Sequence, residues 1–172
     1  ASNESSAFAV LAVLGWNGEQ CDDANVLLSS PNSALVVLRR MTNLEKSKWR
    51  CVLSERSARA HSPVTRLIYR VIQTLIEFPD DVLDGLNVLA TTNKASSPPL
   101  TVFDMWRLSP AQLANMLSRV STPDSLLQVI GEMKSSPPVR EQWCRYLAHE
   151  CAYMTNSIAM VAWRLTITLL QG

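Results

Sequence analysis

Apolar residues recur three and four positions apart along most of the chain, which is the spacing of an amphipathic helix. After Pro31, for example, the positions Leu35, Leu38 and Met41 follow this spacing. We find no segment with the sustained alternation of apolar and polar residues that is typical of a half-buried strand. The pattern therefore predicts an all-α fold.

Pairs of serine or threonine with proline stand at the start of several of these helical segments. Proline is tolerated at the first helical position, because its missing N–H would be unpaired there, and a preceding hydroxyl can cap the next free amides. The pairs are Ser30-Pro31, Ser62-Pro63, Ser109-Pro110, Thr122-Pro123 and Ser136-Pro137. Ser109 is followed three residues later by Gln112, the spacing of a capping box. Each pair predicts the start of a helix.

The spacing of the apolar residues and the positions of the proline pairs together predict an irregular bundle of about ten short helices. Their expected ranges are 6–15, 23–29, 31–41, 44–58, 63–78, 80–90, 101–107, 110–119, 123–134 and 138–170. We expect the last range to be broken near Thr155 to Ser157.

The length of 172 residues fits a single all-helical domain over 1–172. The segment TTNKASSPPL, residues 91–100, is a linker candidate that would join subbundles 1–90 and 101–172. A helical repeat protein would show a fixed period of paired helices, and only the region from Pro110 to Leu147 approaches one. We therefore expect a bundle, with solenoid-like hairpin order in the C-terminal half as the alternative.

Charge is scarce for a chain of this length. Charged residues make up 18%, against roughly 25% in a typical soluble domain, and the net charge is +1. Part of the surface is therefore expected to face a partner. The apolar stretch from Ser157 to Leu170 is too short for a bilayer and contains Arg164, which argues against membrane insertion.

Basic residues are concentrated between positions 39 and 70, and this segment is the strongest candidate for a binding site. The candidate contacts are Arg39, Arg40, Lys46, Lys48, Trp49, Arg50 and Arg56. Arginine and lysine contact phosphates, and an aromatic ring such as Trp49 can stack on single-stranded nucleic acid. The alternatives are a charged protein interface, pairing with the acidic stretch of the same chain, and solvated surface. Trp49 would then be a core residue beside Val52 and Leu53.

Tryptophans are expected in the core, and an exposed one would mark an interface. The chain has Trp16, Trp49, Trp106, Trp143 and Trp163.

The residue types that carry catalysis or bind cofactors form no familiar arrangement in the sequence. The histidines are His61 and His149, and neither belongs to an HExxH motif. The four cysteines form no CxxC, and the glycines form no phosphate-binding loop. We therefore expect no enzymatic activity, no cofactor and no metal site. Free thiols indicate an intracellular, reducing compartment.

The segment FDMWRLSPAQLANMLSRV, from Phe103 to Val120, resembles one unit of the helical repeats in organellar RNA-associated proteins of the octotricopeptide and RAP-associated kinds. The resemblance covers about eighteen residues, centred on a helix that begins with proline and continues as Q-L-A-N-x-L. It implies an RNA-related setting in an organelle such as the mitochondrial matrix.

Taken together, the sequence predicts a non-enzymatic helical interaction or scaffold subunit of a larger protein assembly. Its expected partners are other protein subunits. The alternative is an RNA-binding or ribosome-associated protein that uses the basic segment 39–70.

Overall fold

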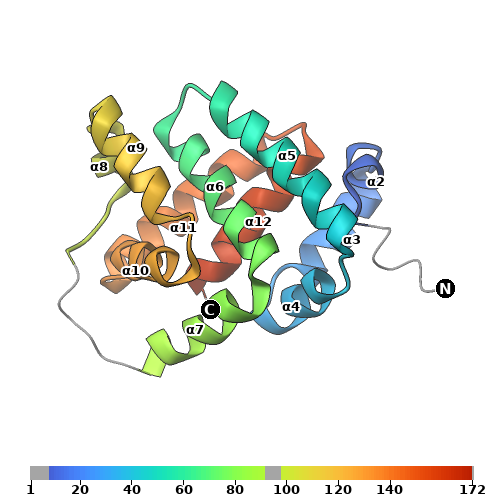
Figure 1. Cartoon of the computed structure of the whole chain (residues 1–172), viewed down its shortest axis with the longest axis horizontal. Helices are drawn as coiled ribbons and strands as arrows, with labels where there is room; N and C mark the ends of the chain where they lie inside the picture. Colours follow the sequence, from blue (N-terminus) through green and yellow to red (C-terminus); the bar gives the residue numbers. More distant parts are fainter. Residues whose placement is uncertain (1–7, 92–97, 172) are drawn as a thin grey trace.

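The computed structural model describes residues 8–91 and 98–171, except for the side chains of 89–91. Every regular element in this part of the chain is a helix, which confirms the all-α prediction (Figure 1). The helices are α2 (Val10–Leu14), α3 (Gly18–Leu27), α4 (Pro31–Arg39), α5 (Asn43–Arg59), α6 (Pro63–Glu77), α7 (Pro79–Thr91), α8 (Val102–Trp106), α9 (Pro110–Arg119), α10 (Pro123–Met133), α11 (Pro137–Ala152) and α12 (Ser157–Gln171). None of the helices described is long and apolar enough to cross a membrane.

The predicted helix starts at serine–proline and threonine–proline pairs are confirmed. Proline lies in the first turn of α4, α6, α9, α10 and α11. In four of these helices the preceding serine accepts a hydrogen bond from the backbone N–H three residues later. Thr122, before α10, makes no such bond with its side chain.

Asparagine caps mark the starts of α3 and α12, and threonines cap α5 and α8. α3 begins at Gly18 rather than at the expected position 23, because Asn17 and Gln20 form a capping box with two bonds of 2.9 Å. The expected break before α12 is confirmed. There Asn156 Oδ1 accepts hydrogen bonds from the N–H groups of Ile158 and Ala159 at 2.9 and 3.2 Å.

The order and lengths of the first five helices recur in the last five. α2 and α8 have five residues each, and α3 and α9 have ten each. The starts of α2, α3 and α4 lie 92 positions before those of α8, α9 and α10, and the starts of α5 and α6 lie 94 positions before those of α11 and α12. We call Phe8–Glu77 the first repeat and Leu100–Gln171 the second repeat. Helix α10 has 11 residues and α4 has nine, and these two extra residues account for the change of offset.

A buried tryptophan fixes the start of each repeat in the same way. Trp49 and Trp143 lie 94 positions apart, and each is 0% exposed. Trp49 Nε1 donates a hydrogen bond to the carbonyl of Phe8 at 2.7 Å, and Trp143 Nε1 donates one to the carbonyl of Leu100 at 2.6 Å. Phe8 and Leu100 occupy equivalent positions, so each tryptophan attaches the long helix of its repeat to the residues that precede the first short helix.

Two equivalent threonines join the repeats by reciprocal hydrogen bonds. Thr74 Oγ1, on α6, donates to the carbonyl of Val120 at 2.6 Å, and Thr168 Oγ1, on α12, donates to the carbonyl of Leu28. Leu28 and Val120 are themselves equivalent, since they follow α3 and α9. A contact in which residue i meets j and j meets i is the mark of twofold symmetry. The two repeats are therefore related by an approximate twofold axis.

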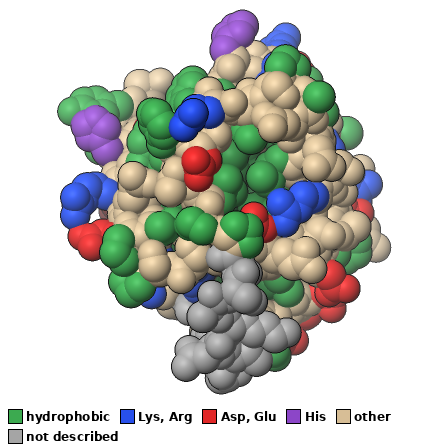
Figure 2. All heavy atoms as spheres, turned by 90° about the vertical axis from the view of Figure 1, so that its left-hand side faces the viewer, with side chains coloured by type: hydrophobic (Ala, Val, Ile, Leu, Met, Phe, Trp, Pro, Cys, Tyr) green, Lys and Arg blue, Asp and Glu red, His purple; other side chains and the backbone are tan. Residues whose placement is uncertain are grey.

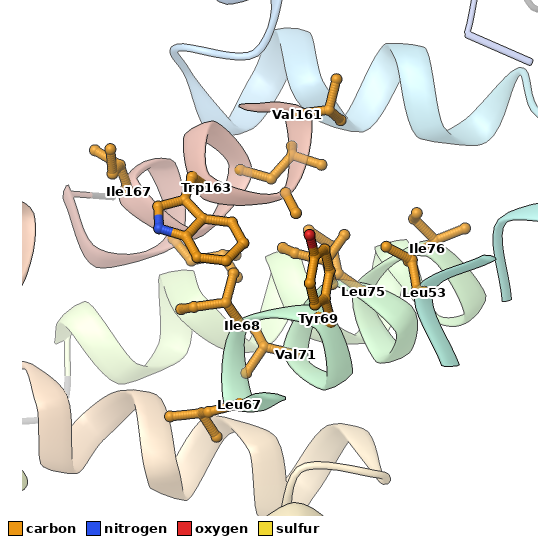
Figure 3. Close-up of a cluster of buried hydrophobic side chains, with 14 of the residues drawn as sticks. Leu53, Leu67, Ile68, Tyr69, Val71, Leu75, Ile76, Val161, Trp163 and Ile167 are labelled. Atoms are coloured by element: carbon orange, nitrogen blue, oxygen red, sulfur yellow. The ribbon is translucent and has the colours of Figure 1, made fainter. Parts of the chain in front are cut away.

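The core lies where α6 and α12 meet on this axis. Tyr69 and Trp163 are equivalent residues whose ring centroids are 5.4 Å apart in an edge-to-face arrangement. Figure 3 shows the two rings side by side among the aliphatic side chains of both helices. In Figure 1, α8 and α9 lie on one side of this central pair, and α2 and α3 lie on the other. The repeats thus share one core, and neither buries its last helix alone.

Helix α7 connects the repeats and packs against α4 and α10, which are equivalent helices. Arg39 Nε on α4 donates to Asp80 Oδ1 on α7 at 2.6 Å. On the α10 side, Gly85 leaves room for Leu127, because a Cβ at position 85 would lie 2.2 Å from Leu127 Cδ1. Most of the linker expected at 91–100 lies outside the described residues.

Candidate functional site

The basic segment 39–70 does not form one continuous cationic surface. Arg39 pairs with Asp80, and Arg50 pairs with Glu77 at 3.3 Å. Arg40 is exposed at the end of α4. Two of the candidate cations therefore contact the acidic stretch of the same chain, which is one of the alternatives that the sequence left open.

The remaining candidates in this segment lie on α5. Trp49 is fully buried and its N–H is used within the core, so it presents no ring for stacking on a nucleic acid base. Lys48 is exposed, whereas Lys46 and Arg56 are half-buried. Arg56 lies two turns from Trp49 and belongs to a different surface, which is described below.

The residue types that could support catalysis or metal binding are dispersed. His61 is exposed in the connection between α5 and α6, and His149 is exposed on α11. Within residues 8–91 and 98–171, no three His, Cys, Asp or Glu side chains are grouped so that they could hold a metal ion. All four cysteines are free, and burial raises the pKa of the Cys144 and Cys151 thiols above the ordinary value.

Exposed aromatic residues gather instead on the second repeat, beginning at α8. Phe103 is 64% exposed and Trp106 is 53% exposed, although Met105 between them is fully buried. The Arg107 guanidinium lies 5.4 Å from the centre of the Phe103 ring, within the range of a cation–π contact. Figure 2 views the molecule from the side that carries α8, α9 and α10, where hydrophobic side chains lie exposed among scattered charges.

A chain of polar contacts connects Trp106 to the core. Its indole N–H contacts the Tyr146 hydroxyl, which in turn lies 3.3 Å from Glu150 Oε2. The other oxygen of Glu150 accepts a hydrogen bond from Trp163 Nε1 at 3.1 Å. Burial, and then the Glu150 carboxylate, raise the pKa of the Tyr146 phenol above its ordinary value. The exposed indole is therefore attached to the central ring pair through α11.

The outer face of α11 extends this surface. His149 and Tyr153 form an edge-to-face pair with centroids 5.1 Å apart, and Tyr153 is 76% exposed. A shallow hollow of about 590 Å³ lies along the same helix, lined by Pro138, Glu141, Gln142, Arg145, Tyr146 and His149. We define the aromatic surface as Phe103, Trp106, Arg107, Tyr146, His149 and Tyr153.

The equivalent positions of the first repeat carry different chemistry. Leu11 and Leu14 replace Phe103 and Trp106, and Val52 replaces Tyr146. The aromatic surface is therefore a property of the second repeat alone. An exposed tryptophan is expected to mark an interface, but nothing in the sequence pattern distinguishes Trp106 from the other four tryptophans.

The chain matches no protein-family model, no curated protein and no solved structure. The segment Phe103–Val120, which resembles a helical repeat unit, covers α8 and α9 together with the turn between them. Its exposed residues Phe103 and Trp106 are part of the aromatic surface.

Proposed function

We propose that this protein is a non-enzymatic interaction subunit that binds another protein through the aromatic surface. The observation that carries the proposal is the 53% exposure of Trp106, whose side chain lies beside Tyr146, a residue bonded to Glu150 of the same helix. Tryptophan, tyrosine and arginine are the residues that most often dominate the binding energy of protein interfaces. All three are present within this surface.

Pre-organisation supports the proposal. A side chain that is mobile before binding loses about 0.5–1.5 kcal/mol when an interface immobilises it. Both exposed rings already have a neighbour in the free protein, Tyr146 beside Trp106 and Arg107 over Phe103, which favours pre-organisation. The low charged fraction of 18% fits a chain that shares part of its surface with a partner.

RNA binding through the basic segment is the weaker alternative. Of its candidate residues, Trp49 is buried, and Arg39 and Arg50 are in ion pairs. Fewer side chains of the basic segment are therefore available to phosphates than its sequence suggests. The exposed rings of the aromatic surface are available to a protein partner.

The test compares the size of the native complex formed by the chain and by two variants. Phe103→Ser/Trp106→Ser removes the centre of the aromatic surface, and Val26→Ser/Leu44→Ser removes two apolar side chains of the first repeat that are more exposed than either ring. Each tagged chain is expressed in its native cell, and its mass is measured by size-exclusion chromatography with light scattering. We expect the wild type and the control variant to elute in a complex, and the aromatic variant to elute as the monomer.

A wild-type chain that is monomeric in its native extract would contradict the proposal. So would an aromatic variant that stays in the complex. Thermal unfolding of the purified variants, with midpoints close to that of the wild type, separates loss of binding from loss of folding.

A further inference from the structure

The first repeat contains a hollow of about 480 Å³ between α2, α5 and α6. Leu14, Val52 and Tyr69 give it an apolar lining, and Glu55, Arg56 and Arg59 supply its charges. Arg59 pairs with Glu55 at 3.4 Å. Among the described residues, the Arg56 guanidinium has no ion-pair or hydrogen-bond partner, so the hollow carries one uncompensated positive charge.

The second repeat has larger side chains at the equivalent positions. Leu14 corresponds to Trp106, Val52 to Tyr146, and Tyr69 to Trp163. In the second repeat these larger side chains are linked by contacts from Trp106 to Tyr146 and from Tyr146 to Glu150. The hollow of the first repeat is thus lined by a leucine and a valine at positions where the second repeat has a tryptophan and a tyrosine.

At the centre of this space, the two repeats carry equivalent side chains of opposite charge. Glu150, which accepts the Trp163 N–H and lies beside the Tyr146 hydroxyl, corresponds to Arg56. A guanidinium has no acceptor atoms and pairs best with a carboxylate. What the first repeat lacks is thus an aromatic ring over the apolar lining and an anion beside Arg56.

We propose that this hollow binds a segment of a partner protein that presents an aromatic side chain next to a carboxylate. The second repeat is the template, since it shows that rings of this size fit between the equivalent helices. The apolar lining formed by Leu14, Val52 and Tyr69 receives the ring, and Arg56 pairs with the carboxylate. The site does not include the aromatic surface of the second repeat, so each of the two proposals can fail without the other.

The experiment titrates the full-length, ¹⁵N-labelled chain with two peptides at up to millimolar concentration. The probe is acetyl-Ser-Glu-Trp-Glu-Ser-amide, and the matched control is acetyl-Ser-Lys-Trp-Lys-Ser-amide. We expect saturable chemical-shift changes at the residues that line the hollow with the acidic peptide, and binding at least about tenfold weaker with the basic one.

Three variants test whether the acidic peptide binds in the hollow. Arg56→Gln should weaken binding of the acidic peptide at least about tenfold, because a charge-assisted hydrogen bond is lost. Leu14→Trp/Val52→Tyr fills the hollow with the residues of the second repeat and should abolish binding. Arg50→Gln, which removes a cation outside the hollow, should leave the affinity unchanged.

The proposal is overturned if the acidic peptide does not bind, if both peptides bind equally, or if its shifts map outside the hollow. It is also overturned if Arg56→Gln binds the acidic peptide as the wild type does. This surface substitution tests the proposal even if the filled variant fails to fold.

Discussion

Two buried threonine hydroxyls donate hydrogen bonds from one repeat to the other. Thr74 and Thr168 are buried, and each donates to a carbonyl at the end of a helix in the opposite repeat. These carbonyls, of Val120 and Leu28, follow the last turn of α9 and α3 and so have no donor from a continuing helix.

We predict that Thr74→Val and Thr168→Val each lower the free energy of unfolding by about 1–3 kcal/mol, because each leaves a buried carbonyl without a donor. Urea denaturation followed by circular dichroism measures the change. Thr166→Val is the control. Thr166 is equally buried, but its hydroxyl bonds to the carbonyl of Ala162 within its own helix, and that carbonyl keeps its backbone donor. A loss for Thr166→Val as large as for the other two would contradict this account.

Cysteine reactivity gives a second prediction at this scale. Burial raises the pKa of Cys144 and Cys151, which lowers the fraction of reactive thiolate at neutral pH, whereas Cys51 is exposed. Iodoacetamide at pH 8, followed by mass spectrometry, should modify Cys51 several times faster than Cys144 and Cys151. In denaturant the rates should converge. Equal rates in the folded protein would show that these thiols are not shielded as described.

The role of a single tryptophan depends on its neighbours in space, which limits what the sequence can predict. The expectation that tryptophans lie in the core is confirmed for Trp49, Trp143 and Trp163. It is wrong for Trp106, because α8 has only five residues and buries Val102 and Met105 on its inner side. The hydroxyl of Tyr146 that the Trp106 indole contacts lies 40 positions along the chain, so no local pattern could reveal it.

At the scale of the helix, the caps determine where each element starts. Ser109 forms a capping box with Gln112, with bonds of 2.9 and 3.2 Å, whereas Thr122 before α10 makes no cap bond with its side chain. Both residues precede a proline in the first helical turn, so they differ mainly in this hydrogen bond.

We predict that Ser109→Ala lowers the free energy of unfolding by about 0.5–2 kcal/mol, the usual cost of losing an N-cap. Thr122→Ala should cost clearly less, since no cap bond is lost. Chemical denaturation of the two variants side by side provides the measurement. Equal losses would mean that the hydroxyl of Ser109 contributes little to α9.

Helix starts were predictable wherever proline and a hydroxyl coincide, because both act within one turn. The starts of α4, α6, α9 and α10 were predicted at the residue where they occur. α3 was predicted five residues late, because Asn17 caps it without a proline and because few apolar residues mark its first turn.

At the scale of the molecule, the two repeats could not be recognised from the sequence. Their common residues are few and scattered, and the two extra residues before α11 shift the offset from 92 to 94. The uneven spacing of the prolines argued against repeated helix pairs, and of the prolines in the two repeats only Pro31 and Pro123 occupy equivalent positions. Shared pairs include Val10 and Val102, Pro31 and Pro123, Met41 and Met133, Trp49 and Trp143, Arg70 and Arg164, and Thr74 and Thr168.

The shared core predicts how the chain behaves when it is divided. α6 and α12 are buried against each other, so each half alone would expose a large apolar face. We expect residues 1–94 and 95–172, expressed as separate chains, to be insoluble alone and to form a one-to-one helical complex when expressed together. Circular dichroism and light scattering measure both properties. Two halves that fold independently and do not associate would contradict the shared core.

The central claim is that the aromatic surface of the second repeat binds a partner protein. Hydrogen exchange of the chain, alone and within the complex isolated from its native cell, tests this claim most directly. The account predicts slower exchange on binding in α8 and α11, which carry the aromatic surface. Exchange in α8 and α11 that binding leaves unchanged would contradict it.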